Sequence, residues 1–270
     1  MTNGTGLDQD GYIAREGHLA RVPQAFTLVV ETAKAAITSA FGPDRLHSAY
    51  LYGSIPRGTA VPGVSDLDVL LAMHQEPGDT DRETASGLEE ALDARFPQIN
   101  GAGIGLASTA TLLSDIERYD LGWFIACLCT PLTGEDLAAR LPRYRPTSLL
   151  ARETNGDLGD LLPRWRGRLG EARTDAGLPA LSRTVSRKLV RTGFTLVMPR
   201  WGGWTSDLGE SAGVFGSYYP ARREQMQLTA AVARTRTADR SMLSMLIDDL
   251  GPWLAAEYVA THGRKTPRAA

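Results

Sequence analysis

Cysteine is scarce in this chain, and that scarcity excludes two kinds of structure. The 270 residues contain two cysteines, Cys127 and Cys129, with one residue between them inside an apolar run. Cysteines this close in sequence form a poor disulfide pair, and no second pair exists to complete a zinc site. We therefore expect two small buried side chains in a protein of the reducing cytoplasm.

The chain also has no long apolar run and little net charge. No segment reaches the length needed to span a bilayer, and residues 1–11 lack the basic and apolar regions of a signal peptide. These absences predict a cytoplasmic location and no membrane partner. The net charge of −2 argues against nucleic acid as a partner. The oligomeric state is left open, homo-oligomers included.

Hydrophobic periodicity divides the chain into two parts. The first part alternates helical and strand patterns, with helices predicted at 22–41, 79–95 and 111–128 and strands at 47–52, 65–73 and 103–108. The second part is mostly helical, with predicted helices at 181–198, 221–234 and 241–258, and prolines and glycines between 141 and 163 mark the junction. We predict an α/β domain over residues 21–145 and a helical domain over 146–260, with flexible segments at 1–20 and 261–270.

One short segment carries two carboxylates with a spacing suited to metal binding. Asp66 and Asp68 lie two positions apart in a predicted strand, so both side chains point to the same side. Neighbouring carboxylates repel each other unless a cation lies between them. Carboxylate oxygens are hard ligands that suit Mg²⁺ bound together with substrate phosphates, and a second divalent ion could bridge the attacking and leaving oxygens.

A glycine-serine corner precedes these acids, at the end of the strand predicted at 47–52. Gly53 permits a close approach of the backbone to phosphate, and the Ser54 hydroxyl can donate a hydrogen bond to a phosphate oxygen. The guanidinium fork of Arg57 matches phosphate geometry. The predicted nucleotide-binding residues of this segment are Gly53, Ser54, Arg57, Thr59 and Ser65.

In this order the motifs resemble a known signature. Tyr52-Gly53-Ser54 followed by Ser65-Asp66-Leu67-Asp68-Val69 resembles the polymerase-beta-like nucleotidyltransferase superfamily. Arg57-Gly58 is similar to the Gly-Ser-x-x-Arg-Gly form of its antibiotic-modifying and minimal members. The succession of an α/β part and a helical part also resembles the aminoglycoside-type enzymes.

The resemblance implies a fold and a reaction. The implied fold is α/β (α+β), a small mixed sheet with flanking helices, followed by a C-terminal helical bundle. The implied reaction moves a nucleoside monophosphate, from ATP or another NTP, onto a hydroxyl of a small-molecule acceptor such as an aminoglycoside-like antibiotic, and releases pyrophosphate. Asp66 and Asp68 would be catalytic and would hold one or two Mg²⁺ ions. An antitoxin-like enzyme that modifies proteins and a non-catalytic nucleotide-binding regulatory protein stay open as alternatives.

The sequence departs from this family at one point. Members usually carry a third carboxylate on a later strand, and the strand predicted at 103–108 contains no acidic residue. Three explanations of the missing carboxylate stay open: two carboxylates are sufficient for catalysis, the protein has lost catalysis, or an acid elsewhere in the chain takes the place of the third carboxylate. The candidate substitutes are Asp115, Glu117, Glu135, Asp207 and Glu210.

A stripe of arginines in the helical part is a second candidate feature. Arg183, Arg187 and Arg191 repeat every four residues, and no acid occurs between residues 182 and 200. The stripe is either a positive wall near the triphosphate or a solvated helix face. On the first interpretation, Arg187 and Arg191 join the predicted nucleotide-binding residues. Trp201 and Trp204, which follow the stripe, either stack on a base or a cyclic acceptor or pack between the two domains.

Overall fold

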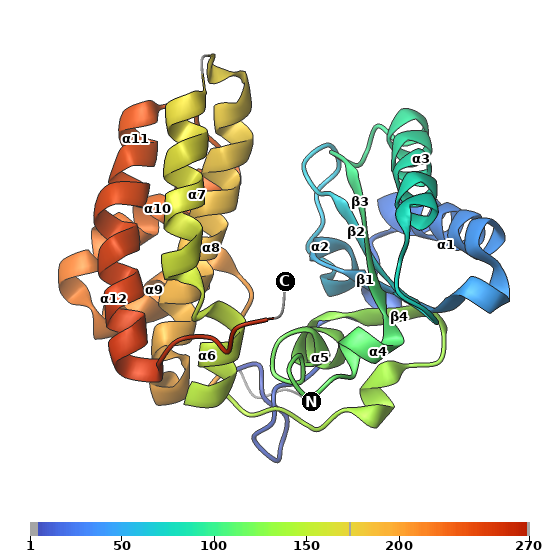
Figure 1. The fold of residues 1–270 in the computed structure, drawn as a ribbon, viewed down its shortest axis with the longest axis horizontal. Helices are drawn as coiled ribbons and strands as arrows, with labels where there is room; N and C mark the ends of the chain where they lie inside the picture. The colour runs from blue at the N-terminus through green and yellow to red at the C-terminus, as the bar shows by residue number, and fades with distance from the viewer. Residues whose placement is uncertain (1–4, 173, 269–270) are drawn as a thin grey trace. The chain divides into compact units, whose positions relative to one another are not determined.

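The computed structural model describes residues 5–172 and 174–268, which fall into two compact units (Figure 1). One unit is formed by residues 14–144, and the other by residues 5–13 together with 145–268. Residues 1–4 of the predicted leader and 269–270 of the predicted tail lie outside the described residues. No helix among the described residues combines the length and the apolar character that a membrane span requires.

A four-stranded mixed sheet, in the order β3-β2-β1-β4, forms the centre of the unit of residues 14–144. β1 (Leu46–Tyr52) pairs antiparallel with β2 (Leu67–Met73) and with β4 (Thr130–Gly134), whereas β2 pairs parallel with β3 (Ala102–Ser108). The expected small mixed sheet is therefore confirmed. The sequence did not predict β4, because it is short and contains a proline, which a sheet tolerates on an edge strand.

One face of the sheet is covered by two long helices. α1 (Gln24–Arg45) and α3 (Asp79–Arg95) pack their apolar sides on this face, where Leu67, Val69 and Leu71 of β2 are fully buried. Because side chains alternate along a strand, Asp68 belongs to the opposite face. The long helices therefore leave the carboxylate of Asp68 outside the main core.

Short helical segments cover the opposite face, where one long helix was expected. The segment predicted as a helix over 111–128 is divided into α4 (Thr109–Leu112), α5 (Leu121–Trp123) and a π-helical turn, η2 (Phe124–Leu128). The expectation of a continuous helix was wrong, because Asp120 has non-helical backbone angles and Gly122 fits closely against Leu141 and Tyr144. These tertiary contacts outweigh the helical pattern of the sequence.

Both cysteines lie in or beside this second layer, and the prediction that they are free and buried is confirmed. Burial raises the pKa of the Cys127 thiol to about 12 and raises that of Cys129 well above its ordinary value. Neither thiol is therefore ionised near neutral pH, which excludes them as nucleophiles in the folded protein.

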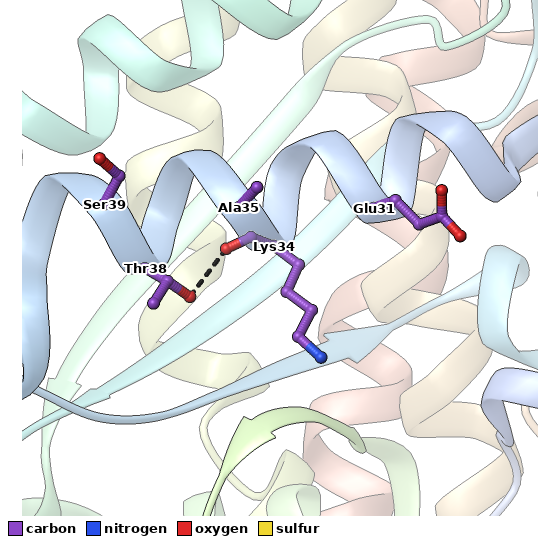
Figure 2. A pocket seen from close by; sticks show the side chains of 5 residues that line it. All are labelled: Glu31, Lys34, Ala35, Thr38 and Ser39. Atoms are coloured by element: carbon purple, nitrogen blue, oxygen red, sulfur yellow. Dashed lines mark hydrogen bonds between the residues drawn. The ribbon is translucent and has the colours of Figure 1, made fainter.

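A shallow surface depression runs along the outer side of α1 (Figure 2). Its lining side chains all come from this one helix and do not converge on a point, and one of them, Thr38, donates its hydroxyl to the carbonyl of Lys34. The lining residues are Glu31, Lys34, Ala35, Thr38 and Ser39. A binding site requires polar groups that converge inside a concave surface, so this depression is no candidate site.

The second unit is a bundle of helices. α8 (Leu178–Trp201) is its central helix and contacts α6 (Ser148–Asn155), α7 (Leu158–Glu171), α9 (Leu208–Tyr218), α10 (Arg223–Thr235) and α12 (Gly251–His262). The helix predicted at 181–198 lies inside α8, which confirms it, and the expected helical bundle is also confirmed. The helix predicted at 241–258 is interrupted, because a π-helical turn, η6 (Leu246–Leu250), joins α11 (Arg240–Met245) to α12.

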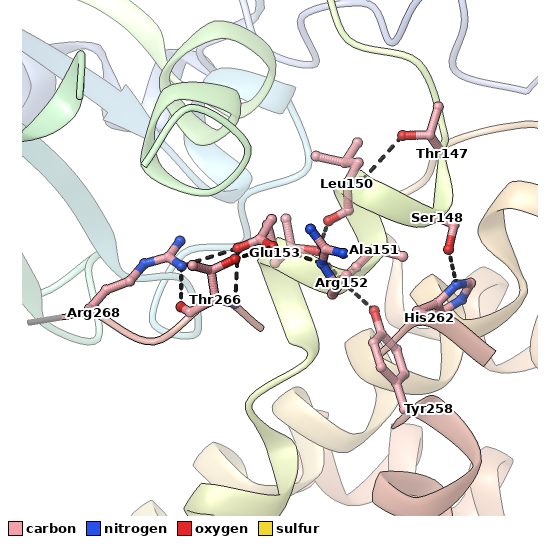
Figure 3. A network of polar contacts seen from close by, with 11 residues as sticks. Thr147, Ser148, Leu150, Ala151, Arg152, Glu153, Tyr258, His262, Thr266 and Arg268 are labelled. Atoms are coloured by element: carbon pink, nitrogen blue, oxygen red, sulfur yellow. Dashed lines mark hydrogen bonds and ion pairs between the residues drawn. The ribbon is translucent and has the colours of Figure 1, made fainter. Parts of the chain in front are cut away.

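The end of the chain is bound to α6 through a buried acid (Figure 3). The Glu153 carboxylate accepts hydrogen bonds from the backbone and hydroxyl of Thr266 and from Nη1 of Arg268, and it also pairs with Arg152. Only 6% of the Glu153 side chain is exposed. Burial raises the pKa of this carboxyl, but the combined donors outweigh burial and hold the pKa below its ordinary value.

Replacing Glu153 by glutamine should therefore destabilise the helical unit in a pH-dependent way. We expect the free energy of unfolding to fall by about 1–3 kcal/mol at pH 7, because charged hydrogen bonds to a buried carboxylate are lost. A lowered folded-state pKa stabilises the protein above the unfolded-state pKa, so the difference from wild type should shrink as the pH falls below the ordinary value of 4.5. Urea unfolding between pH 3 and 7 measures this, with the exposed Glu171→Gln as control. A difference that does not change with pH would contradict the assignment.

Candidate active site

The centre of the candidate site is the contact between the glycine-serine corner and Asp68. β1 ends at Tyr52, which pairs with Asp68 across the antiparallel ladder, and α2 (Ser54–Arg57) begins directly after Gly53. Gly53 has a φ of 82°, and a Cβ added to it would lie 2.4 Å from Oδ2 of Asp68. Only glycine allows the carboxylate to lie so close to the backbone at this corner.

Asp66 lies just outside the strand on which it was predicted. β2 begins at Leu67, but two hydrogen bonds of 2.9 Å extend its pairing with β3 toward the segments that precede the two strands. Leu67 N–H donates to the carbonyl of Gly101, and Asn100 N–H donates to that of Ser65. The side-chain amide of Asn100 also donates to Oδ1 of Asp66 at 2.9 Å. Asn100 therefore orients one carboxylate of the pair, a role that no sequence pattern had indicated.

Two of the predicted nucleotide-binding hydroxyls take part in hydrogen bonds of the connecting loop. Oγ of Ser65 accepts from Val61 N–H at 2.9 Å, and the hydroxyl of Thr59 donates to the carbonyl of Ser54 at 3.5 Å. Thr59 N–H donates to the same carbonyl at 3.0 Å. These bonds fix the loop between the glycine-serine corner and Asp66. A direct contact of either hydroxyl with nucleotide stays a prediction.

Arg57 ends α2 and is held by a residue that the sequence had placed in a flexible leader. Its Nη1 donates to Oε2 of Glu16 at 3.4 Å, and the side chains are 31% and 13% exposed respectively. Glu16 and Asn100 are the polar partners of the site that sequence reasoning missed. Neither lies in a motif, and only the folded chain brings them to it.

The register of the sheet shows which residue of β3 lies beside Asp68. In the parallel pairing of β2 with β3, Asp68 lies beside Gly103, so a side chain at this position would project to the same face. Nothing lies within 4 Å of the position that a Cβ of Gly103 would occupy. There is therefore room for a third carboxylate beside Asp68, but the residue at this position of β3 is a glycine.

The acids proposed as substitutes differ in their surroundings. Asp115 pairs with Arg118 and is 88% exposed, whereas Glu117 is buried. Asp207 caps α9, pairs with Arg234 and belongs, like Glu210, to the helical unit. Glu135 is exposed at the end of β4. Within the described residues no three acidic, histidine or cysteine side chains form a group that could hold a metal ion. Substitution by another acid stays a prediction.

The residues of the corner fit Mg²⁺ bound together with a nucleotide. A protein usually holds Mg²⁺ through one or two carboxylates and leaves the remaining positions to phosphates and water. Asp66 and Asp68 supply hard oxygen ligands, and the closeness of Asp68 to the Gly53 backbone places one of them at the corner. Two carboxylates would be too few ligands for a metal ion that is bound by protein groups alone.

The arginine stripe belongs to the helical unit. Arg187 and Arg191 lie on α8, half-buried and exposed respectively. Their place beside a nucleotide therefore stays a prediction. Trp201 and Trp204 both pack edge-on against Phe194, with ring centroids 5.7 and 5.5 Å away. Both tryptophans therefore have packing partners inside the helical unit, whereas stacking on a substrate ring and packing between the domains stay predictions.

Comparison with known proteins shows the class of fold. No protein-family model and no curated protein matches the sequence. Among solved structures, the chain is similar to spectinomycin adenyltransferase AAD(9) from Enterococcus faecialis, crystallised with ATP and spectinomycin. The two are 13% identical, with a TM-score of 0.52, and the match covers 86% of this chain and 98% of that chain. This chain has a nucleotidyltransferase-type fold.

Proposed function

We propose that this protein transfers a nucleoside monophosphate from an NTP, AMP from ATP in the first instance, to a hydroxyl group of a small molecule. The observation that carries the proposal is the contact of Asp68 with the Gly53 backbone, which joins a carboxylate to a corner suited to phosphate. The acceptor oxygen forms a bond to the α-phosphorus, the bond from that phosphorus to the β-phosphate oxygen breaks, and pyrophosphate leaves. The proton of the hydroxyl passes to water.

Each residue of the corner has a role in this reaction. Asp66 and Asp68 would hold Mg²⁺, and a bound Mg²⁺ would supply positive charge beside the phosphates. The backbone at Gly53, the hydroxyl of Ser54 and the guanidinium of Arg57 hold the β- and γ-phosphates. Asn100 keeps the Asp66 carboxylate in position through its hydrogen bond of 2.9 Å. With Gly103 beside Asp68, no carboxylate of β3 takes the acceptor proton.

Two features support a small acceptor. The structural neighbour was crystallised with ATP and spectinomycin, and the match covers 98% of its chain. The chain's small net negative charge of −2 also suits a cationic acceptor such as an aminoglycoside-like antibiotic. We propose a cytoplasmic enzyme that acts on antibiotics of this kind.

One observation favours a second candidate function. The bare Gly103 position beside Asp68 fits a protein that binds nucleotide and regulates a partner without catalysis. The two functions are separated by incubating the protein with each labelled NTP, Mg²⁺ and a panel of antibiotics, followed by mass spectrometry. An acceptor that gains one nucleoside monophosphate, together with release of pyrophosphate, supports the enzyme. Saturable ATP binding without any product across the panel supports the regulator.

Gly103→Asp tests whether this position faces the metal. The new carboxylate would lie beside Asp68, and two like charges on neighbouring strands destabilise a sheet by about 0.2–1 kcal/mol. We expect a lower melting temperature in EDTA than wild type and a larger rise on addition of Mg²⁺, because a further hard ligand is present. Gly105→Asp, two residues further along the same face of β3, is the matched control. Equal responses of both variants to Mg²⁺ would contradict the placement.

A further inference from the structure

Residues 14–22, which we call the entry strap, form a fixed part of the sheet-containing unit. The backbone of the strap bonds to two separate elements: Glu16 N–H donates to the carbonyl of Cys127 in η2, and His18 N–H to that of Pro56 in α2, each at 2.9 Å. Between them lies Gly17, where a Cβ would come within 2.3 Å of Oγ1 of Thr130 and 2.9 Å of Cβ of Pro56. The strap therefore passes between β4 and α2 at a distance that only glycine permits.

Two arginines fix the strap before and after Glu16. The guanidinium of Arg15 donates to both carboxylate oxygens of Asp136, at 2.7 and 3.2 Å, and to the carbonyl of Ala126 at 3.2 Å. Arg21 donates back to the carbonyl of Glu16 at 2.9 Å. These contacts fix the backbone position of Glu16, and the fold therefore sets the place from which its side chain extends.

The side chain of Glu16 reaches the arginine of the phosphate-binding corner. Its Oε2 lies 3.4 Å from Nη1 of Arg57, and the carboxylate is the more buried of the two groups, at 13% exposed. A guanidinium offers five donors in a rigid plane, so a contact with a carboxylate at one of its nitrogens restricts the orientation of the plane. An arginine restrained before the anion arrives loses less conformational entropy on binding.

We propose that Glu16 is a positioning residue that holds Arg57 in place to receive the pyrophosphate part of the nucleotide. The proposal rests on the function proposed above and adds a residue of the entry strap to its machinery. Glu16 acts through Arg57 and does not contact the substrate. Its removal should weaken the binding of pyrophosphate about three- to tenfold, the range expected for ordering one long side chain.

A double-mutant cycle tests the proposal, with pyrophosphate as the probe and isothermal titration calorimetry as the readout. Glu16→Ala should raise the Kd three- to tenfold in the wild-type background and leave it unchanged in the Arg57→Gln background, because the effect passes through Arg57. Glu16→Gln keeps an acceptor oxygen and should give an intermediate value. It also carries the test if the alanine variant does not fold.

Asp44→Asn is the control, since it removes an exposed acid of the same unit that lies outside the strap and the corner. It should leave the Kd for pyrophosphate unchanged. An equal rise in Kd for Asp44→Asn and Glu16→Ala, or unchanged or tighter binding by the Glu16 variants, would overturn the positioning role while the proposed function stands. A wild-type protein that neither binds pyrophosphate nor yields product would overturn both.

Discussion

Asp68→Asn is expected to reduce nucleotidyl transfer about 10³-fold, the size of effect seen when one electrostatic partner of a transition state is lost. Asparagine keeps the shape of the side chain and removes its charge, so the corner at Gly53 should be undisturbed. The melting temperature in EDTA should equal or exceed that of wild type, because a charge that repels Asp66 is removed. Product formation by mass spectrometry and thermal unfolding measure the two effects.

The control for this substitution is an acid of the same unit that lies away from the corner. Asp44 is exposed in the last turn of α1, and Asp44→Asn should leave both transfer and the stabilisation by Mg²⁺ unchanged. If Asp68→Asn lost activity only in proportion to a loss of folded protein, its effect would be structural. If it kept the full rate, the proposed metal-binding role of Asp68 would be wrong.

Gly53→Ala has the second largest expected effect. The new Cβ would lie 2.4 Å from Oδ2 of Asp68, so the carboxylate or the corner must move, and the φ of 82° is unfavourable for alanine. Strain of this kind costs about 1–2 kcal/mol of stability. A displacement of about 1 Å at a reacting centre costs about 10²-fold in rate. We therefore expect a loss of transfer of that size, measured as kcat/KM for the NTP.

A substitution at Gly42 is the control that separates the effect of backbone strain from the effect of displacing Asp68. Gly42 has a φ of 64°, lies near the end of α1, and has nothing within 4 Å of its Cβ position. Gly42→Ala should therefore lose a comparable amount of stability and keep its activity. Equal losses of activity in Gly42→Ala and Gly53→Ala would show that the contact with Asp68 has no functional importance.

Local pattern was enough to predict the regular elements of the fold. The helix predicted over 79–95 coincides with α3, and the strand predicted at 47–52 differs from β1 by one residue. α3 begins where the Asp81 carboxylate accepts from Gly78 N–H at 2.7 Å, an interaction between residues close in sequence. Signals of this kind act within one or two turns, so the sequence alone contains them.

Elements that depend on distant contacts were predicted poorly. β4 is an edge strand, and the helical pattern over 111–128 is interrupted where Gly122 meets Leu141 and Tyr144. Residues 14–20 of the entry strap belong to the segment predicted as a flexible leader, and there Arg15 bonds to Asp136, more than a hundred positions away. No local periodicity marks such a contact, because its energy comes from residues that meet only after folding.

The order and spacing of Gly53, Ser54, Arg57, Asp66 and Asp68 were fixed by the sequence alone, and with them the kind of chemistry that we propose. Residue type determines which groups can hold phosphate or metal, and chain spacing determines that a strand end and its following turn carry them. The tertiary structure decided the rest: Asp68 against Gly53, Asn100 on Asp66, Glu16 on Arg57, and an empty position at Gly103. These are contacts between separate segments, and their geometry follows from the register of the sheet and the path of the entry strap, which no short stretch of sequence determines.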